Sequence, residues 1–434
     1  MMNWLTHKLA ERRRWLIIAL LFCLSVVNYL DRQTLSVLAP TLREKLNFGT
    51  VEYSYVVAAF LAAYAIGFAV SGRVLDRIGV KLGIACALAF WSAAGMLHAV
   101  AAGWVALAVC RFLLGLGESF NVPGSVKAIS EWIPPRERAL STAIFSNGFT
   151  IGAMIAPPLV SVIAIQFGWQ CAFLVTGAIG FALLVVWQRF YDAPETHRGI
   201  SAAEREYILA SRGGGKSPEK TSAWQVIRHP YCYGLLVARL LTDPLPYFFT
   251  FWLPEYLKSN RGFTLAMIGL LGWIPFLAAD VGGPGGGALS DWLVRRGGSP
   301  EKARLRVMFG AACVMPLAAV AVRTPSTWIS LGLIALLLGA HSCWIANLLT
   351  TSSEVFPRHQ VGTVVGLAGM GGSIGGIIST LLTGRVIASY GYVPVFTALA
   401  FFHLTAFLFL NYALRRHAPG RRDEAVAKHL EEVI

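Results

Sequence analysis

Charged side chains are scarce in this sequence. Asp, Glu, Lys and Arg make up 14% of the 434 residues, whereas they make up about a quarter of a soluble domain. Hydrophobic residues account for 56% and gather in long runs, and a helix crosses a membrane with roughly 20 apolar residues. The composition therefore excludes a soluble protein. It predicts an all-α, multi-pass membrane protein with twelve transmembrane helices.

Cysteines and chemical motifs are also few. The seven cysteines lie in or beside apolar segments, and none has the spacing of zinc ligands. We interpret them as packing residues rather than as a disulfide framework or a metal site. No nucleophile–base motif and no phosphate-binding loop is visible. We therefore expect no enzyme activity, no metal and no cofactor.

Acidic residues are outnumbered, with 23 Asp and Glu against 37 Lys and Arg. Such an excess would suit a nucleic-acid partner, but its distribution favours a membrane. Few basic residues fall at the ends of spans assigned to the outside, namely Arg43, Lys45, Lys258, Arg261 and Arg323. This is the positive-inside pattern. It predicts a protein in the lipid bilayer with both termini cytoplasmic and no nucleic-acid partner. We further expect a monomer in a bacterial inner membrane.

One long hydrophilic segment, 191–228, interrupts the apolar array. It predicts a cytoplasmic linker with a short surface helix near 202–211. The linker divides the chain into an N-terminal six-helix bundle, 1–190, and a C-terminal six-helix bundle, 229–434, that ends in a short tail. We expect no cleavable signal peptide, because the first apolar run is too long for one.

The two halves carry matching motifs in the same order. The matching pairs are Gly72 with Gly287, Asp76 with Asp291, Gly148 with Gly371, and Gly152 with Gly375. Parallel six-helix repeats around a midplane site are the layout of a large class of transporters. The repeat therefore predicts transport rather than a purely structural role.

The turn after the second span suits a conformational latch. Its aspartate can pair with cations or with a helix N-terminus, and Gly79 permits a tight bend. We predict that four residues act as latch residues: Gly72, Asp76, Arg77 and Asp291. An ordinary positive-inside loop would explain the arginines of this turn. It would not explain the G-x-x-x-D-R-x-G-x-K spacing of residues 72–81.

Asp31 and Arg32 lie side by side within the first span. A charge at such a depth costs about 2.5–3.5 kcal/mol on insertion scales, so it normally faces a polar cavity. Consecutive helical residues point about 100° apart, so one partner cannot serve both side chains. We predict that Arg32 binds a substrate anion and that Asp31 takes part in coupling. A structural salt bridge is the alternative.

The fourth span carries Arg111 and Glu118. Arg111 lies at nearly the depth of Asp31, which predicts an ion pair between them. Glu118 has no obvious cation nearby in its own helix, and burial favours a protonated carboxyl. We predict that Glu118 is the main proton site and that Asp31 and Arg111 assist it. The alternative is a neutral carboxyl that is merely hydrogen-bonded within tight packing at Gly115 and Gly117.

Uncharged polar residues complete the predicted substrate site. They are Tyr29, Tyr64, Asn147, Asn347 and Ser373. Each can hydrogen-bond a hydroxyl or a carboxylate, although a tyrosine in a membrane helix is as often a packing residue.

The seventh span, expected over Pro230–Leu257, contains an arginine and an aspartate. Arg239 and Asp243 are spaced i,i+4 and can pair with each other. Pro244 and Pro246 should break the helix and expose backbone groups to a cavity. Further along the chain, His341 and His403 lack metal-ligand spacing, and we interpret them as satisfied interior histidines.

Several of these motifs resemble a known family. Residues 72–81 read GRVLDRIGVK, which matches the G-x-x-x-D-R-x-G-x-K signature of the major facilitator superfamily. Residues 28–32 (NYLDR) and 111–119 (RFLLGLGES) are similar to its anion:cation symporter family. Residues 241–244 (LTDP) and 251–254 (FWLP) resemble bacterial hexuronate transporters. The resemblance implies uptake of a sugar-acid anion, such as glucuronate or galacturonate, with protons and by alternating access.

The resemblance leaves the substrate open. An aldonate, a glucarate-type acid or an aromatic acid is an alternative, as are exchange in place of symport and a transporter-like sensor. Relatives that take linear aldonates often carry glutamine near the position of Phe149. The short linker and tail disfavour a sensor.

Overall fold

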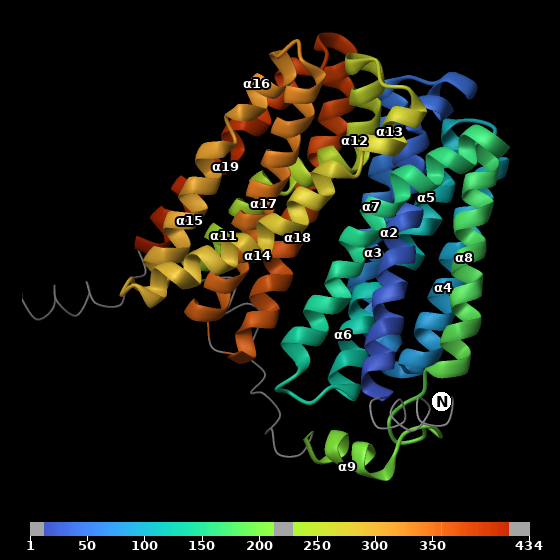
Figure 1. The fold of residues 1–434 in the computed structure, drawn as a ribbon, viewed down its shortest axis with the longest axis vertical. Helices are drawn as coiled ribbons and strands as arrows, with labels where there is room; N and C mark the ends of the chain where they lie inside the picture. Colours follow the sequence, from blue (N-terminus) through green and yellow to red (C-terminus); the bar gives the residue numbers. More distant parts are fainter. Residues whose placement is uncertain (1–12, 212–228, 357, 416–434) are drawn as a thin grey trace, which may run out of the picture. The chain divides into compact units, whose positions relative to one another are not determined.

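The computed structural model describes residues 13–211, 229–356 and 358–415, where every regular element is a helix (Figure 1). The rest of the predicted linker and tail lies outside the described residues. The first part of the chain forms α2 (Arg13–Lys45), α3 (Thr50–Ile78), α4 (Val80–Leu97), the 3-10 turn η1 (His98–Val100), α5 (Trp104–Glu118), α6 (Asn121–Trp132), α7 (Arg138–Phe167), α8 (Trp169–Phe190) and α9 (Ala202–Ser211). The second part forms α11 (Pro230–Thr242), α12 (Pro244–Arg261), α13 (Leu265–Leu271), α14 (Ile274–Arg295), α15 (Pro300–Val314), α16 (Leu317–Arg323), α17 (Thr327–Val355), α18 (Arg358–Tyr390) and α19 (Val393–Arg415).

Eleven helical segments among the described residues are long and apolar enough to cross a membrane. The remaining expected span, Pro230–Leu257, is divided into α11 and α12 at Asp243. Pro244 begins α12, where its missing N–H and fixed φ are tolerated. The predicted all-helical, multi-span architecture is confirmed, and so is the predicted break in the seventh span.

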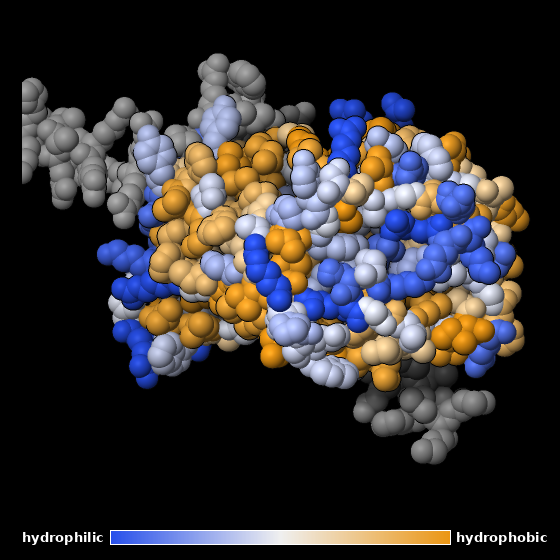
Figure 2. Space-filling view, turned by 90° about the horizontal axis from the view of Figure 1, so that it is seen from above, coloured by the Kyte–Doolittle hydropathy of each residue, from blue (hydrophilic) through white to orange (hydrophobic). Residues whose placement is uncertain are grey.

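Large hydrophobic side chains remain exposed along the spans, as a lipid environment requires. Val105 on α5, Val185 on α8 and Leu408 on α19 are each more than half exposed. In a view from above, hydrophilic residues gather in a band and hydrophobic residues cover other parts of the same face (Figure 2). This distribution fits helices that meet lipid on their sides and water at their ends.

Contacts divide the described chain into two compact units. Unit 1 comprises the described residues up to 211 together with 246–280 and 377–395. Unit 2 comprises 229–245, 281–376 and the described residues from 396 onward. These compact units differ from the two six-helix bundles predicted from the sequence, because α12, α13 and the start of α14 pack with the first six helices. The bundle boundaries stay a prediction.

Specific contacts hold α12 within unit 1. Glu255 forms an ion pair with Arg43 of α2, and Lys258 pairs with Glu44 at 2.5 Å. The Tyr53 hydroxyl on α3 donates to the Phe251 carbonyl at 2.7 Å. One end of α12 is thus fixed to α2 and α3 by charge and by a buried hydrogen bond.

Glycines allow close helix packing in both units. In unit 1, a Cβ on Gly148 or Gly152 of α7 would lie 2.6 Å from the carbonyl oxygen of Phe22 or Val26 on α2. In unit 2, a Cβ on Gly371 of α18 would lie 2.7 Å from the Leu236 carbonyl oxygen on α11, and Gly375 meets the next turn of α11. Small residues at such crossings let backbones approach each other. The glycine pairs matched by the sequence repeat therefore have the same packing role.

The predicted surface helix is present as α9. The backbone N–H groups of Arg13 and Arg14 donate to the Glu204 carboxylate at 2.9 and 3.2 Å. An acidic group at a helix N-terminus complements the helix dipole. Helix α9 therefore lies at the start of α2.

Candidate functional site

Arg32 and Glu118 form a buried ion pair between α2 and α5. The Arg32 Nη2 and Nε atoms donate to Glu118 Oε2 at 2.9 and 3.1 Å. The side chain of Glu118 is fully buried and that of Arg32 is 12% exposed. The sequence shows no cation near Glu118 within its own helix. The correction is that Arg32, 86 residues away along the chain, supplies the positive charge.

Depth explains why these two residues meet. At 1.5 Å per residue, Arg32 lies about 20 Å from the Lys45 end of α2, and Glu118 lies about 21 Å from the Trp104 end of α5. Glu118 is also the last residue of α5, at the break that separates α5 from α6. The pair is therefore near the middle of both crossings.

Aromatic rings surround the Arg32 guanidinium. Its Cζ lies 5.1 Å from the ring centre of Tyr29, 5.0 Å from that of Phe60 and 4.8 Å from that of Tyr64. Cation–π contacts gain strength when they are desolvated. The Tyr29 hydroxyl also lies 3.5 Å from the Thr250 hydroxyl on α12. Two predicted substrate residues, Tyr29 and Tyr64, thus lie directly on Arg32.

Arg111 and Asp31 do not form the ion pair that the sequence predicted. Arg111 is 1% exposed, and its Nη2 donates to the backbone carbonyl of Arg32 at 3.0 Å. The polar neighbours of Asp31 include Trp91 and Thr176, and the charge of Arg111 still acts on it without a direct ion pair. Neither carboxylate oxygen of Asp31 has a hydrogen bond with good geometry. The 100° separation of neighbouring helical residues directs Asp31 and Arg32 into different surroundings.

Asn147 pairs with an aspartate that sequence analysis did not place in the site. With its amide oriented to satisfy its neighbours, the Asn147 nitrogen donates to the two Asp280 oxygens at 2.7 and 3.2 Å. Asn147 comes from α7 and Asp280 from α14, and both belong to unit 1. An acid in the middle of an apolar segment was a visible signal for Asp280.

In unit 2, the predicted polar residues bond within their own helices. Arg239 and Asp243 form the expected i,i+4 ion pair, with an N–O distance of 2.6 Å. Asn347 Nδ2 donates to the Cys343 carbonyl at 2.9 Å, and the Ser373 hydroxyl donates to the Gly369 carbonyl at 3.2 Å. Asn347 Oδ1 has no hydrogen-bond partner. The substrate roles of Asn347 and Ser373 stay predictions.

The two interior histidines contact each other. His341 Nδ1 lies 3.0 Å from His403 Nε2, and both rings are buried. The expectation of interior histidines is met, although His403 Nδ1 has no hydrogen-bond partner. No group of three or more metal-binding side chains is found in the described part of the chain.

Both latch aspartates pair with cations from their own unit. Asp76, near the end of α3, pairs with Lys127 of α6. Asp291 pairs with Arg304 of α15 at 2.7 Å. Gly79 joins α3 to α4 with φ of 81°, a conformation that glycine adopts readily. The latch assignment itself stays a prediction.

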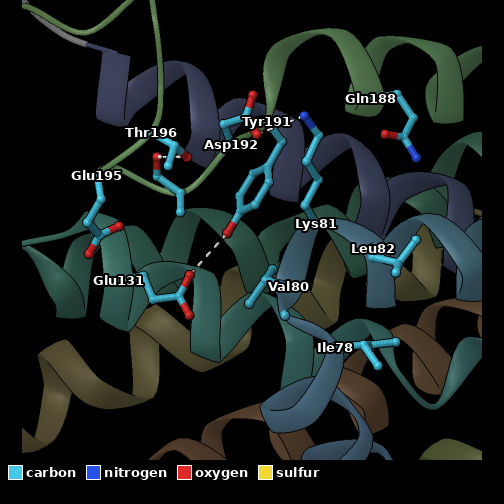
Figure 3. A pocket seen from close by; sticks show the side chains of 12 residues that line it. Ile78, Val80, Lys81, Leu82, Glu131, Gln188, Tyr191, Asp192, Glu195 and Thr196 are labelled. Carbon is cyan, nitrogen blue, oxygen red and sulfur yellow. Dashed lines mark hydrogen bonds and ion pairs between the residues drawn. The ribbon is translucent and has the colours of Figure 1, made fainter.

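A surface pocket lies beside this turn rather than at the buried charges (Figure 3). Its lining includes Lys81, which pairs with Asp192 at 2.8 Å, and Tyr191, whose hydroxyl lies 3.5 Å from Glu131. None of Arg32, Glu118 and Asp280 lines it. Since the chemistry lies deep within the spans, we assign the candidate site to the buried residues and not to this pocket.

Comparison with known proteins agrees with this architecture. The hexuronate transporter of Escherichia coli is 34% identical over 396 residues, which cover 90% of this chain and 91% of that protein. The galacturonate transporter of Dickeya chrysanthemi is 38% identical over 272 residues, 62% of this chain and 79% of that protein. A D-galactonate transporter of Escherichia coli is 28% identical over 88% of this chain and 91% of that protein.

The fold is also found among solved structures. A bacterial homolog of the human lysosomal transporter Spinster, in an inward-facing and unoccupied conformation, aligns with a TM-score of 0.73. The alignment covers 93% of this chain and 96% of that one at 18% identity. Residues 21–380 match the sequence profile of the Major Facilitator Superfamily. With its membrane-spanning helices and its relatives, the chain therefore belongs to the Major Facilitator Superfamily and is a membrane transporter rather than an enzyme.

Proposed function

We propose that this transporter imports a sugar-acid anion, a hexuronate such as glucuronate or galacturonate, together with protons. The observation that carries the proposal is the Arg32–Glu118 ion pair, because it sets a buried arginine against a carboxylate that a substrate can replace. The relatives named as hexuronate and galacturonate transporters support the substrate class.

Competition for Arg32 couples the proton to the substrate. When Glu118 takes up a proton, it loses the charge that attracts the guanidinium. A substrate carboxylate then takes its place, because the planar fork of arginine suits a carboxylate. Loss of the Glu118 proton restores the ion pair and expels the substrate.

Neighbouring residues extend this scheme. Asp31, a buried carboxyl without good hydrogen bonds, is stable when neutral and is the second proposed proton site. Arg111 holds the backbone at Arg32 and so couples the two acids. Tyr29, Tyr64 and Asn147 are the proposed ligands for substrate hydroxyls, and the substrate roles predicted for Asn347 and Ser373 are part of the proposal.

The charge distribution supports the proposed orientation of the protein in its membrane. Both termini are placed in the cytoplasm of a bacterial inner membrane, and the protein works as a monomer by alternating access. The latch residues assist this movement, because Asp76 and Asp291 lie at the ends of helices and far from the buried charges.

Reconstituted vesicles test the proposal. Purified protein is loaded with unlabelled acid, and counterflow of labelled glucuronate, galacturonate, galactonate, glucarate and an aromatic acid is measured. We expect fast counterflow of the hexuronates and accumulation driven by an inward proton gradient. Absence of counterflow for every sugar acid would refute the proposed function.

A second candidate is an aldonate as substrate, which the similarity to a D-galactonate transporter favours. Preferential counterflow of galactonate in the same panel would support it over a hexuronate. Counterflow without any response to a proton gradient would favour an exchanger.

A further inference from the structure

Asp280 is an acid in the middle of a membrane crossing. The crossing formed by α13 and α14 runs over Leu265–Arg295, and Asp280 lies about 22 Å from either end at 1.5 Å per residue. Among the described residues, no Lys, Arg or His forms an ion pair with it. Ionisable residues at this depth are costly and usually functional. Because an amide is the partner of Asp280, we expect the aspartate to have a functional role.

The surroundings of Asp280 are polar on the side of α7. Asn147, its hydrogen-bond partner, lies on a stripe of exposed or half-exposed polar side chains with Thr142, Ser146 and Thr150. Polar groups within a span normally face a water-filled cavity or another helix rather than hydrocarbon. Asp280 and the stripe therefore border the aqueous part of unit 1.

The spacing between Arg32 and this pair suits a small extended ligand. Gly148 of α7 packs on the Phe22 carbonyl of α2, and Gly152 packs one turn further along on Val26. Asn147 therefore lies beside the part of α2 that precedes Arg32 by about eight residues. Eight residues correspond to about 12 Å along the axis of α2. A six-carbon acid with hydrogen bonds at both ends spans a distance of this order.

The carboxylate of Asp280 retains capacity for further hydrogen bonds. An ionised carboxylate has about four acceptor sites, and the single amide nitrogen of Asn147 leaves several of them free. Such a group accepts bonds from hydroxyls and repels another carboxylate. It therefore distinguishes a polyhydroxy tail from an anionic one.

We propose that Asp280, positioned by Asn147, is a specificity-determining residue of the substrate site. It accepts hydrogen bonds from hydroxyls at the end of the sugar acid remote from Arg32, and it excludes acids with a carboxylate at both ends. This inference rests on the proposed function. It narrows the substrate class to monoanionic polyhydroxy acids and disfavours dianionic aldarates. Repulsion of the wrong ligand is a common source of specificity.

Competition in vesicles tests the proposal. Counterflow of labelled glucuronate is measured with unlabelled galacturonate or galactarate as competitor, and the ratio of their inhibition constants gives the discrimination. Asp280→Asn keeps the shape and removes the charge, so we expect discrimination against galactarate to fall at least tenfold. Asn147→Ala should weaken galacturonate binding several-fold and keep the discrimination, because the carboxylate remains.

Two further variants control the comparison. Glu206→Gln removes an exposed carboxylate from α9 and should leave both inhibition constants unchanged. Asp280→Glu keeps the charge, so its discrimination should stay within threefold of the wild-type value. Asp280→Glu also tests the proposal if Asp280→Asn does not fold. A loss of discrimination against galactarate in Asp280→Glu, which keeps the charge, would overturn the proposal.

The outcomes separate the two levels of inference. An unchanged inhibition ratio in active Asp280→Asn would show that the aspartate only joins α14 to α7, and the proposed transport function would stand. If the wild-type protein exchanges no sugar acid at all, the proposed function fails first, and the specificity role fails with it.

Discussion

The Arg32 side chain shows how a charge is accommodated inside a membrane protein. One edge of its guanidinium meets Glu118, and three aromatic rings lie around it. Its own backbone carbonyl accepts a hydrogen bond from Arg111. The ion pair and the ring contacts therefore both depend on a flat, forked cation at this position.

We expect that Arg32→Lys folds but loses most of its substrate affinity. The ammonium retains the charge, but it cannot form two parallel bonds to a carboxylate or stack flat on the rings. Equilibrium binding to purified protein measures the effect, and we expect at least a tenfold loss. Wild-type affinity in this variant would remove Arg32 from the proposed site.

The two ion pairs differ in how easily the sequence reveals them. Arg239 and Asp243 lie four residues apart on one helix, and their pairing follows from helix geometry alone. Arg32 and Glu118 lie on different helices, so their meeting depends on how α2 and α5 pack. The sequence identified both residues as important. It could not predict their contact, and it likewise missed the bond between Asp280 and Asn147.

At the scale of helices, glycines determine which segments approach closely. On α14, a Cβ at Gly282 would collide with the backbone carbonyl of Gly339 on α17. Gly285, on the same helix, has open space where its Cβ would lie. The α14–α17 crossing in unit 2 therefore requires glycine at one of these positions and not at the other.

Gly282→Ala should destabilise the protein, whereas Gly285→Ala should not. A methyl group forced against backbone typically costs about 1–3 kcal/mol, while alanine in open space gains about 1 kcal/mol in helix propensity. Thermal unfolding of the two purified variants provides a matched comparison. Equal midpoints would mean that α14 and α17 have room to separate.

The latch aspartate is an element-scale feature because it joins the end of α3 to α6. The Asp76 side chain is 71% exposed, and exposed ion pairs contribute little to stability. We expect Asp76→Asn to slow transport several-fold with substrate affinity unchanged. Binding and counterflow on the same preparation check this, and loss of binding in folded protein would contradict the latch role.

At the scale of the whole molecule, the chain passes from one compact unit to the other at proline- and glycine-rich sites. One passage follows Leu245, between Pro244 and Pro246, and another follows Asp280, just before Gly282. Helix bends occur mostly at such residues. Proline and glycine thus mark two of the points where segments of one helix belong to different units.

Transport by the whole molecule should become uncoupled in Glu118→Gln. Glutamine imitates the protonated acid, so substrate can bind and exchange in either direction. Concentrative uptake needs the proton to leave, and glutamine cannot release it. We expect counterflow within a few-fold of wild type and loss of accumulation driven by a proton gradient. Normal accumulation would transfer the main proton role to Asp31.

The fold was more predictable than the division into units. Apolar run lengths predicted the spans, and Pro244 predicted the broken one, because both depend on local chemistry. The grouping of α12 with α2 and α3 depends on long-range contacts such as that between Tyr53 and Phe251. The sequence repeat gave no indication of these contacts, so its bundle boundary differs from the compact units.

The break between α11 and α12 also matters while the protein is being synthesised. Among the described residues, neither α11 nor α12 counts among the segments that are long and apolar enough to cross a membrane. It carries Arg239 and Asp243, and a charge at a helix centre costs about 2.5–3.5 kcal/mol on insertion. Their mutual pairing lowers this cost, and Arg43 and Glu44 of α2 offer α12 charges that match its own. We therefore expect entry of this segment into the bilayer to depend on the earlier insertion of α2.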